Sequence, residues 1–353
     1  MNEKITLISN QKNWMDSLAL EQLQKIAGLP DVVRAVGLPD LHAGKTPVGF
    51  AVLTENVVYP QLLGGDIGCG MALFHTGMTA KKYKREKWQQ KLEKVQGLEN
   101  IPLTRQFGDC PMQSFGTIGG GNHFAEFQIA DNVIDETFLT DFGIQQGDIL
   151  LLVHSGSRDL GQRIAYEFQE GVGLSGSYAE KYLCKQDEAL RWAKENRKEI
   201  AGKLFDILGL MQEPQLLLDS CHNFAVHTEK GILHRKGAVS AKEGAAVIPG
   251  SRGSLTYLMR TLDDTSLSLN SLSHGAGRKW ARSMCRPRLK NKYTWQTIRQ
   301  TSLKSFVICH DAKLLFEEAP EAYKKIEHVI SGLEEHRLAV TAATFRPLLT
   351  FKD

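Results

Sequence analysis

An aspartate and a cysteine that are three residues apart, Asp66 and Cys69, lie in the apolar, glycine-rich stretch 63–71. A carboxylate and a thiolate can both bind a divalent cation, and the glycines allow a tight turn that directs both side chains to one point. An isolated pair of this kind is more often a buried thiol beside a turn carboxylate. Four histidines farther along the chain, each next to small or basic residues, favour a metal site instead: His123, His154, His234 and His274.

The collected residue types indicate phosphate chemistry. One carboxylate, one thiolate and three imidazoles are more ligands than a single catalytic zinc ion usually takes, and a thiolate can bridge two ions. Two divalent cations suit phosphoryl transfer because they stabilise both the attacking and the leaving oxygens. Arginines and glycine-rich loops near the histidines supply further groups for binding anions. A fourth histidine then remains for another role.

Composition limits the class of protein. The 353-residue chain is 42% hydrophobic and 24% charged, as is typical of a globular protein. No apolar run approaches the roughly 20 residues that a membrane-spanning helix needs, and the N-terminus lacks the layout of a signal peptide. The six cysteines show no paired spacing, so free thiols in a reducing compartment are expected. We therefore expect a cytoplasmic protein without a membrane partner.

Cationic residues cluster in two places, although the net charge of +3 is too small to indicate a nucleic-acid partner by itself. The run 81–87 contains five lysines and arginines, and such a run is most often a solvated surface. The run 278–292 contains seven, interleaved with aromatic residues, and begins just after His274. Such residues can neutralise phosphates and stack on bases. For this second run, a nucleic-acid surface and a solvated face both remain open.

Hydrophobic periodicity predicts helices at about 16–27, 81–95, 177–208, 215–228 and 326–338, and strands at 32–36, 50–53 and 149–153. The last strand would place His154 at its end. His222 and His227 fall on the helix expected at 215–228, where packing or orienting roles are favoured. Residues after 338 are expected to form a C-terminal tail. Because the candidate ligands extend from Asp66 to His274 without a linker, we expect one α+β domain over residues 1–353.

Five motifs in this order resemble those of the RtcB family of RNA ligases. They are GDIGCGM at 65–71, GNHF at 121–124, HSGSR at 154–158, HRKGA at 234–238 and SHGAGR at 273–278. A PDLH element at 39–42, the tail residues 322–324 and Lys352 extend the likeness over nearly the whole chain. The resemblance implies mixed β-sheets around a metal-lined central cleft, with helices outside.

The resemblance also implies an activity and a ligand set. The family uses GTP and Mn²⁺ to join RNA ends that carry a 3′-phosphate or 2′,3′-cyclic phosphate to ends that carry a 5′-hydroxyl. By motif matching, two Mn²⁺ ions would share Cys69: Asp66, Cys69 and His123 would bind one ion, and Cys69, His154 and His234 the other. His274 would be the catalytic nucleophile that takes GMP from GTP.

Further binding residues follow from the same motifs. Arg158 and Arg282 would bind RNA. Thr256 stands where a serine is expected, and its hydroxyl is retained. The guanine nucleotide would be bound by Asn122, His123, Phe124, Ala125, Glu126, His234, Arg235, Pro249, Gly250, Ser251, Arg252, Thr256, His274, Gly275, Ala276, Gly277, Tyr323 and Lys352.

The chain is shorter than the usual family member, and its 40–46 loop and its tail resemble the branch encoded beside peptide-chain release factor H in bacteria. That branch implies RNA repair, with ribosomal or transfer RNA as substrate and a functional link to release factor H, and archease is a possible activating partner. Two other functions fit the same ligands. One is a dinuclear metal phosphodiesterase or phosphatase that needs no GTP, and the other is a non-catalytic, metal-stabilised RNA-binding module.

Overall fold

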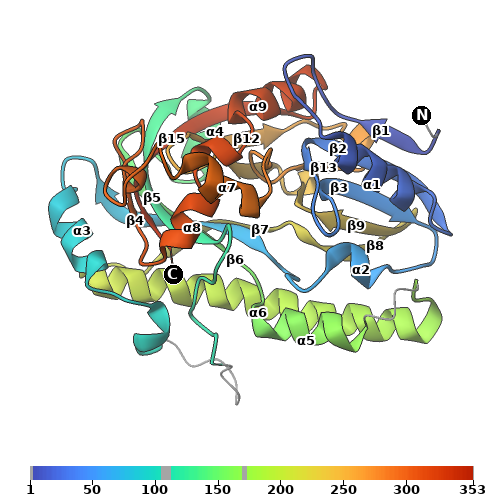
Figure 1. Ribbon diagram of the computed structural model, residues 1–353, viewed down its shortest axis with the longest axis horizontal. Coiled ribbons are helices and arrows are strands. Elements are labelled where there is room, and N and C mark those ends of the chain that lie inside the picture. The colour runs from blue at the N-terminus through green and yellow to red at the C-terminus, as the bar shows by residue number, and fades with distance from the viewer. Residues whose placement is uncertain (1–2, 105–112, 169–172, 353) are drawn as a thin grey trace.

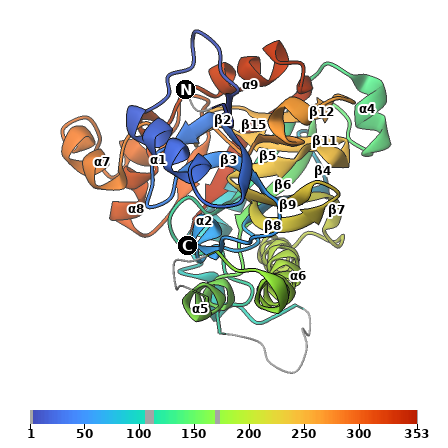
Figure 2. The same cartoon turned by 90° about the vertical axis from the view of Figure 1, so that its right-hand side faces the viewer.

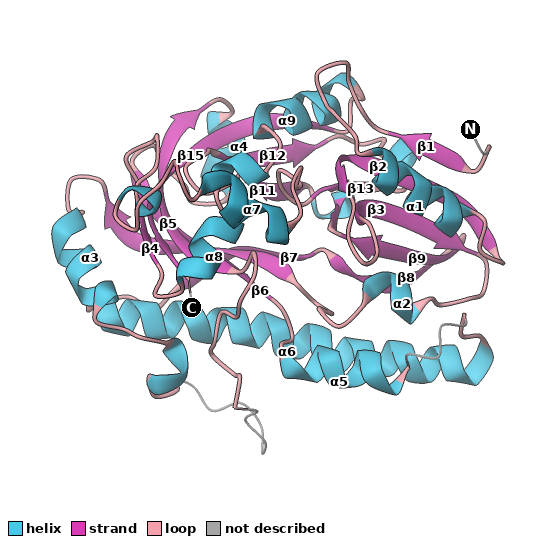
Figure 3. Cartoon of the chain, viewed as in Figure 1, coloured by secondary structure: helices cyan, strands magenta, loops and turns pink. Residues whose placement is uncertain are grey.

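The computed structural model describes residues 3–104, 113–168 and 173–352, and it is an α+β fold with helices outside two main sheets (Figures 1 and 3). The smaller sheet has the strand order β1-β2-β3-β9-β8. β1 is parallel to β2, and the other neighbours are antiparallel. The strands are β1 (Ile5–Leu7), β2 (Val32–His42), β3 (Val48–Thr54), β8 (Asn223–Thr228) and β9 (Gly231–Lys236).

The larger sheet has the order β11-β12-β15-β5-β6-β4-β7, and β14 pairs in parallel with β15. A short antiparallel pair, β10 with β13, lies apart from it. These strands are β4 (Gly70–Thr79), β5 (Phe124–Val133), β6 (Asp148–Ser155), β7 (Gln215–Cys221), β10 (Ala238–Ser240), β11 (Ala245–Pro249), β12 (Thr256–Thr261), β13 (Ser271–Ser273), β14 (Phe306–Ile308) and β15 (Ala339–Phe351).

A long helix, α6, runs along one side of the molecule and contacts strands of both sheets (Figures 1 and 2). Its buried face packs Leu204 and Phe205 against Phe127 and Leu151 of the larger sheet. Burying each such side chain contributes about 1.5–3 kcal/mol. The helices are α1 (Ser17–Ala27), α2 (Pro60–Leu63), α3 (Arg85–Glu93), α4 (Glu136–Asp141), α5 (Asp159–Glu167), α6 (Gly176–Leu208), α7 (Arg282–Leu289), α8 (Ala312–Glu317) and α9 (Ile326–Glu335).

Several elements confirm the sequence-based predictions. Asp16 caps α1 by accepting the backbone N–H of Leu18, as expected for a helix start at this point. The structure also contains the expected helices α3, α6 and α9 and the expected strand β6. Five cysteines are free thiols, and Cys110 lies outside the described residues. In the three described ranges, no helix combines the length and apolar character required to cross a membrane.

Two predictions are wrong. Residues 215–228 are not a helix but the strands β7 and β8, which pair with β4 and β9. Short apolar runs fit both the helical and the strand period of hydrophobic residues, and here pairing with neighbouring strands determines the secondary structure. Residues 339–351 are not a tail but β15, which lies between β12 and β5 inside the larger sheet. Pro347, which disfavours a central strand, sits at a register shift.

Candidate metal and nucleotide site

The candidate ligands meet at one end of the larger sheet, where the starts of β4 and β5 lie beside the ends of β6 and β7. Cys69 directly precedes β4, and His123 directly precedes β5. His154 is the penultimate residue of β6, and His222 directly follows β7. Because antiparallel neighbours run in opposite directions, the start of one strand lies beside the end of the next. The strand order β5-β6-β4-β7 therefore gathers four distant segments.

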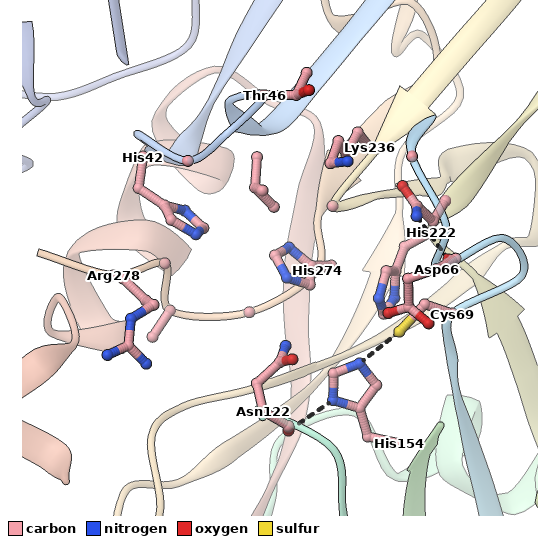
Figure 4. A pocket seen from close by; sticks show the side chains of 18 of the residues that line it. His42, Thr46, Asp66, Cys69, Asn122, His154, His222, Lys236, His274 and Arg278 are labelled. Carbon is pink, nitrogen blue, oxygen red and sulfur yellow. Dashed lines mark hydrogen bonds between the residues drawn. The ribbon is translucent and has the colours of Figure 1, made fainter. Parts of the chain in front are cut away.

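The thiol of Cys69 is at the centre of the cluster. Its Sγ lies 3.2 Å from His123 Nε2 and 3.1 Å from His154 Nε2. The ligand atoms of these three residues all lie within 4.8 Å of one another. Asp66 Oδ2 lies 3.1 Å from His123 Nε2. Figure 4 shows Asp66, Cys69 and His154 converging on one region. A carboxylate, a thiol and two imidazoles at this spacing form a site that fits a divalent cation.

Both imidazoles in the cluster are oriented by backbone carbonyls. His123 Nδ1 lies 3.1 Å from the Ile118 carbonyl oxygen, and His154 Nδ1 lies 3.1 Å from that of Asn122. A carbonyl accepts a hydrogen bond from Nδ1–H, so each Nε2 presents its lone pair toward Cys69. Burial holds the pKa of His154 well below its usual value, so this imidazole is neutral and able to bind a metal.

His222 extends the cluster toward His274. It is the single residue between β7 and β8, at the point where the chain passes from one sheet to the other. Its backbone N–H donates to the Cys69 carbonyl at 2.8 Å, and its ring centroid lies 5.2 Å from that of His154. Its Nδ1 is buried and has no hydrogen-bond partner among the described residues. A buried ring nitrogen without a partner is costly unless a ligand binds it.

The structure does not bring His234 into this cluster. His234 lies inside β9, where its Nε2 accepts the backbone N–H of Tyr59 at 2.9 Å. Its Nδ1 lies 3.4 Å from the Val52 carbonyl oxygen. Both ring nitrogens thus face backbone groups of neighbouring segments. It is His222, rather than His234, whose ring lies beside that of His154.

His274 directly follows β13, and its ring lies beside that of His222, with 4.7 Å between the centroids (Figure 4). Its Nδ1 lies 2.7 Å from Oδ2 of Asp40, which is fully buried in β2. The carboxylate favours the tautomer with the proton on Nδ1, which leaves the lone pair of the ring on Nε2. Gly277, at φ +70°, allows the 274–278 loop to approach Asp40, because a Cβ at this position would lie 2.2 Å from the Asp40 carbonyl oxygen.

These groups line one cavity of about 1350 Å³. Asp66, Cys69, His154, His222 and His274 all contribute to its wall. Most of the residues expected to bind the nucleotide line it as well, namely Asn122, Phe124, Glu126, Pro249, Gly250, Ser251, Arg252, Thr256, His274, Gly275, Ala276, Gly277, Tyr323 and Lys352.

The sequence model of the family described as tRNA-splicing ligase RtcB matches residues 22–108, 102–173 and 171–353. The chain belongs to the RtcB family of RNA ligases. Among its relatives, RNA-splicing ligase RtcB2 of Escherichia coli is 40% identical over 100% of this chain and 97% of that protein. The tRNA-splicing ligases RtcB of Archaeoglobus fulgidus and Nanoarchaeum equitans are 24% and 25% identical, over 94% and 100% of this chain and 90% and 96% of those proteins.

Four residues expected to contact the nucleotide in this RtcB family member lie outside the cavity lining: His123, Ala125, His234 and Arg235. Arg235 is buried and donates to Ser271 Oγ at 2.9 Å and to the Asn270 carbonyl at 3.0 Å, so it connects β9 to the start of β13. Of the two arginines expected to bind RNA, Arg282 lines the cavity, whereas Arg158 lies in a separate shallow pocket beside Thr117.

Charged groups on the cavity wall are suited to a nucleotide. Nε and Nη1 of Arg252 are buried without a hydrogen-bond partner in the described ranges, and burial lowers the pKa of this guanidinium. Glu126 accepts hydrogen bonds from Gln128 at 2.7 Å and Thr350 at 2.5 Å, and burial raises its pKa. Burial lowers the pKa of Lys352 to about 8. A buried guanidinium without partners is a ready site for an anion such as phosphate.

Sequence reasoning missed three residues that build this site: His222, Asp40 and Arg197. Arg197 reaches from α6 and donates to the carbonyls of Gly68 at 2.9 Å and Ser155 at 2.7 Å. It also pairs with Asp219 at 2.6 Å. This fully buried side chain thereby fixes the turn before Cys69 against the end of β6. The PDLH element drew attention to the segment of Asp40, but no local pattern in α6 distinguishes Arg197.

Proposed function

We propose that this chain is a GTP- and Mn²⁺-dependent RNA ligase that joins RNA 3′-phosphate or 2′,3′-cyclic phosphate ends to 5′-hydroxyl ends through a histidine–GMP intermediate. The observation that carries the proposal is the position of His274. Its imidazole is oriented by Asp40 and opens into the same cavity as the thiol–histidine cluster and a wall suited to a nucleotide. Family membership supports the same class of reaction.

We assign the metal ligands with one change from the sequence-based expectation. Asp66, Cys69 and His123 would bind one Mn²⁺ ion, and Cys69, His154 and His222 would bind the second, with His222 in place of His234. Bound there, the two ions would neutralise phosphate oxygens. The neutral imidazoles of His154 and His222 fit this role, because a metal ion binds an unprotonated nitrogen. Burial raises the pKa of the Cys69 thiol, and a cation bound there would offset that cost by stabilising the thiolate.

His274 acts as the nucleophile. Its Nε2 attacks the α-phosphorus of GTP, a nitrogen–phosphorus bond forms, and the bond to the bridging oxygen breaks as pyrophosphate leaves. Asp40 holds the Nδ1 proton and stabilises the positive charge that the ring acquires. An oxygen of the RNA 3′-phosphate then attacks the phosphorus of the GMP on His274, and the nitrogen–phosphorus bond breaks. The 5′-hydroxyl of the second RNA end loses its proton, attacks the phosphorus of the activated 3′-phosphate and displaces GMP, which forms the phosphodiester bond. A cyclic phosphate is first hydrolysed to the 3′-phosphate.

The cavity wall supplies the nucleotide contacts. Glu126 presents carboxylate oxygens that can accept the N–H donors of guanine, and Arg252 presents guanidinium N–H groups to the phosphates. The biological setting belongs to the same proposal: a cytoplasmic role in RNA repair on ribosomal or transfer RNA, a functional link to release factor H, and activation by archease. The likeness to RNA-splicing ligase RtcB2 over nearly the full length of both chains supports the RNA ligase activity in this setting.

A labelling experiment tests the proposal. The purified protein is incubated with Mn²⁺ and α-labelled GTP and is then analysed by denaturing electrophoresis, with His274→Ala beside the wild type. We expect an acid-labile label on the wild type and none on the variant, although the variant still binds metal. No label on the wild type under any of several divalent metals would overturn the proposal. It would favour instead the phosphodiesterase, which uses the same ligands but has no need for an imidazole oriented by a buried carboxylate.

A further inference from the structure

The cationic run 278–292 forms an exposed surface at the rim of the cavity. The segment 265–310 contains nine lysines and arginines and no aspartate or glutamate, whereas the whole chain is nearly balanced, with 43 basic and 40 acidic residues. Within this segment, α7 buries only Cys285 and Leu289. The cations of α7 therefore face solvent. Figure 2 shows that α7 projects from the side of the molecule.

Acidic partners neutralise only part of this charge. Four of the nine cations pair with acids that lie outside the segment: Arg278 and Arg282 with Glu318, Lys292 with Glu321, and Arg299 with Glu93. In contrast, Lys279, Arg286, Arg288 and Lys290 have no acidic partner among the described residues. Arg288 and Lys279 instead lie over the ring of Trp280, at 4.7 Å and 5.5 Å from its centroid. Two cations without an acidic partner in the described ranges thus lie against this aromatic side chain.

Three of the cations form a stripe. Arg282 and Arg286 of α7 are four residues apart, and Lys290, the C-cap residue, follows four residues later, so the three lie on one side of the helix with about 6 Å of axis between neighbours. Like charges at this spacing repel one another and destabilise a helix, so the stripe is unfavourable for folding by itself. Arg282 and Trp280 line the cavity, whereas Arg286 and Lys290 do not. The stripe therefore begins at the reaction site and leads away from it along the surface.

We propose that this stripe, with Trp280 at its start, binds the phosphodiester backbone of single-stranded RNA outside the cavity. The inference rests on the proposed ligase function, because an RNA end that reacts at His274 must leave the cavity as a longer strand. A line of exposed cations next to an aromatic ring matches the groups that bind single strands, where cations follow the phosphates and rings stack on bases.

The test compares two double variants that remove equal charge. Arg286→Ala/Lys290→Ala removes the outer part of the stripe. Lys81→Ala/Lys87→Ala removes two exposed cations near α3, a helix at the edge of the molecule in Figure 1. Affinity is measured across a series of salt concentrations for 3′-phosphate and 5′-hydroxyl RNAs, each in a short form that ends inside the cavity and in a longer form. Labelling with GTP, measured in parallel, shows whether each variant is folded.

For at least one of the longer RNAs, we expect the stripe variant to bind more weakly. Its plot of log affinity against log salt should be shallower by about 1.4, since each lost phosphate contact contributes about 0.7 for a single strand. Binding of the short RNAs, GTP labelling and the Lys81→Ala/Lys87→Ala control should match the wild type. Unchanged slopes for both longer RNAs, or an equal change in the control, would overturn the inference. Absence of GTP labelling in the wild type would instead overturn the proposed function.

Discussion

The Nδ1 atom of His274 lies 2.7 Å from the carboxylate of Asp40, although the two residues are 234 positions apart. The same carboxylate oxygen also faces the backbone N–H of His274 at 3.3 Å. One buried acidic side chain thus orients both the loop and the ring. The arrangement leaves a single imidazole nitrogen free to face the cavity, as a nucleophile at this position requires.

Replacing Asp40 with asparagine should slow the transfer of GMP to His274 by at least about a hundredfold. An amide carries no charge to stabilise the imidazolium, and its N–H₂ group can favour the wrong tautomer of the ring. The initial rate of labelling with α-labelled GTP at saturating nucleotide measures the effect. Bound Mn²⁺ should be unchanged, since Asp40 is not among the proposed ligands. A labelling rate close to that of the wild type would show that Asp40 does not orient the nucleophile.

Because we assign His222 rather than His234 as a metal ligand, variants at these two positions should differ in metal content. His222→Ala should bind one Mn²⁺ ion where the wild type binds two, because the second ion loses one of three protein ligands. His234→Gln should still bind two ions, since its ring nitrogens face the backbone of Tyr59 and Val52. Equilibrium dialysis followed by elemental analysis measures both. Loss of an ion in His234→Gln but not in His222→Ala would restore the sequence-based assignment.

These two histidines show what the sequence could and could not specify. Cys69, His123 and His154 were predicted because each lies in a glycine-rich motif, but their convergence depends on the strand order β5-β6-β4-β7. No local pattern specifies that order. His222 was placed on an expected helix, and only the pairing of β7 and β8 with strands of different sheets moves it to the site.

Helices and strands also differ in how far the sequence predicts them. The helices α1 and α6 were predictable because their apolar residues repeat with the helical period over many turns. The strand β15 was not, because its burial depends on neighbours on both sides that are far away in the chain. For a similar reason, the roles of Arg197 and Asp40 could not be identified from local sequence patterns. Each acts on backbone or side-chain groups that the tertiary structure alone brings within reach.

Arg252 should affect nucleotide binding and stability in opposite directions. Two of its nitrogens are buried without a hydrogen-bond partner among the described residues, so Arg252→Met should leave the free protein as stable or more stable. GTP should bind about tenfold to a hundredfold more weakly, the equivalent of one hydrogen bond to a charged group. Thermal unfolding with and without GTP measures both effects.

Arg235→Met is the matched control for this prediction, because Arg235 is also buried but is bonded to Ser271 and Asn270. It should destabilise the protein, since it removes the two hydrogen bonds that Arg235 donates to Ser271 and Asn270, and it should not weaken the binding of GTP. If Arg252→Met instead lost stability while keeping full affinity for GTP, its guanidinium would be a structural group rather than a nucleotide contact.

The raised pKa of Glu126 predicts that nucleotide binding weakens at acidic pH, which we call the acid limit of binding. Burial raises the pKa of this carboxyl above its ordinary value of 4.5, and only the ionised form offers both oxygens as acceptors to the N–H donors of guanine. Affinity for GTP should therefore be constant at neutral pH and fall as the pH drops through the raised pKa. Glu318, also on the cavity wall, does not produce this limit. Although burial opposes it, the charges of Lys352 and Arg278 lower the pKa of Glu318.

Glu126→Gln should remove the acid limit and weaken GTP binding by about tenfold at neutral pH, because the amide offers one acceptor oxygen where the carboxylate offers two. Titration of GTP affinity against pH, with wild type and variant side by side, gives both results. The amide keeps the size of the side chain, so its contacts with Gln128 and Thr350 can largely remain. If the variant showed the same acid limit, the titrating group would be another residue, and Glu126 would not contact guanine.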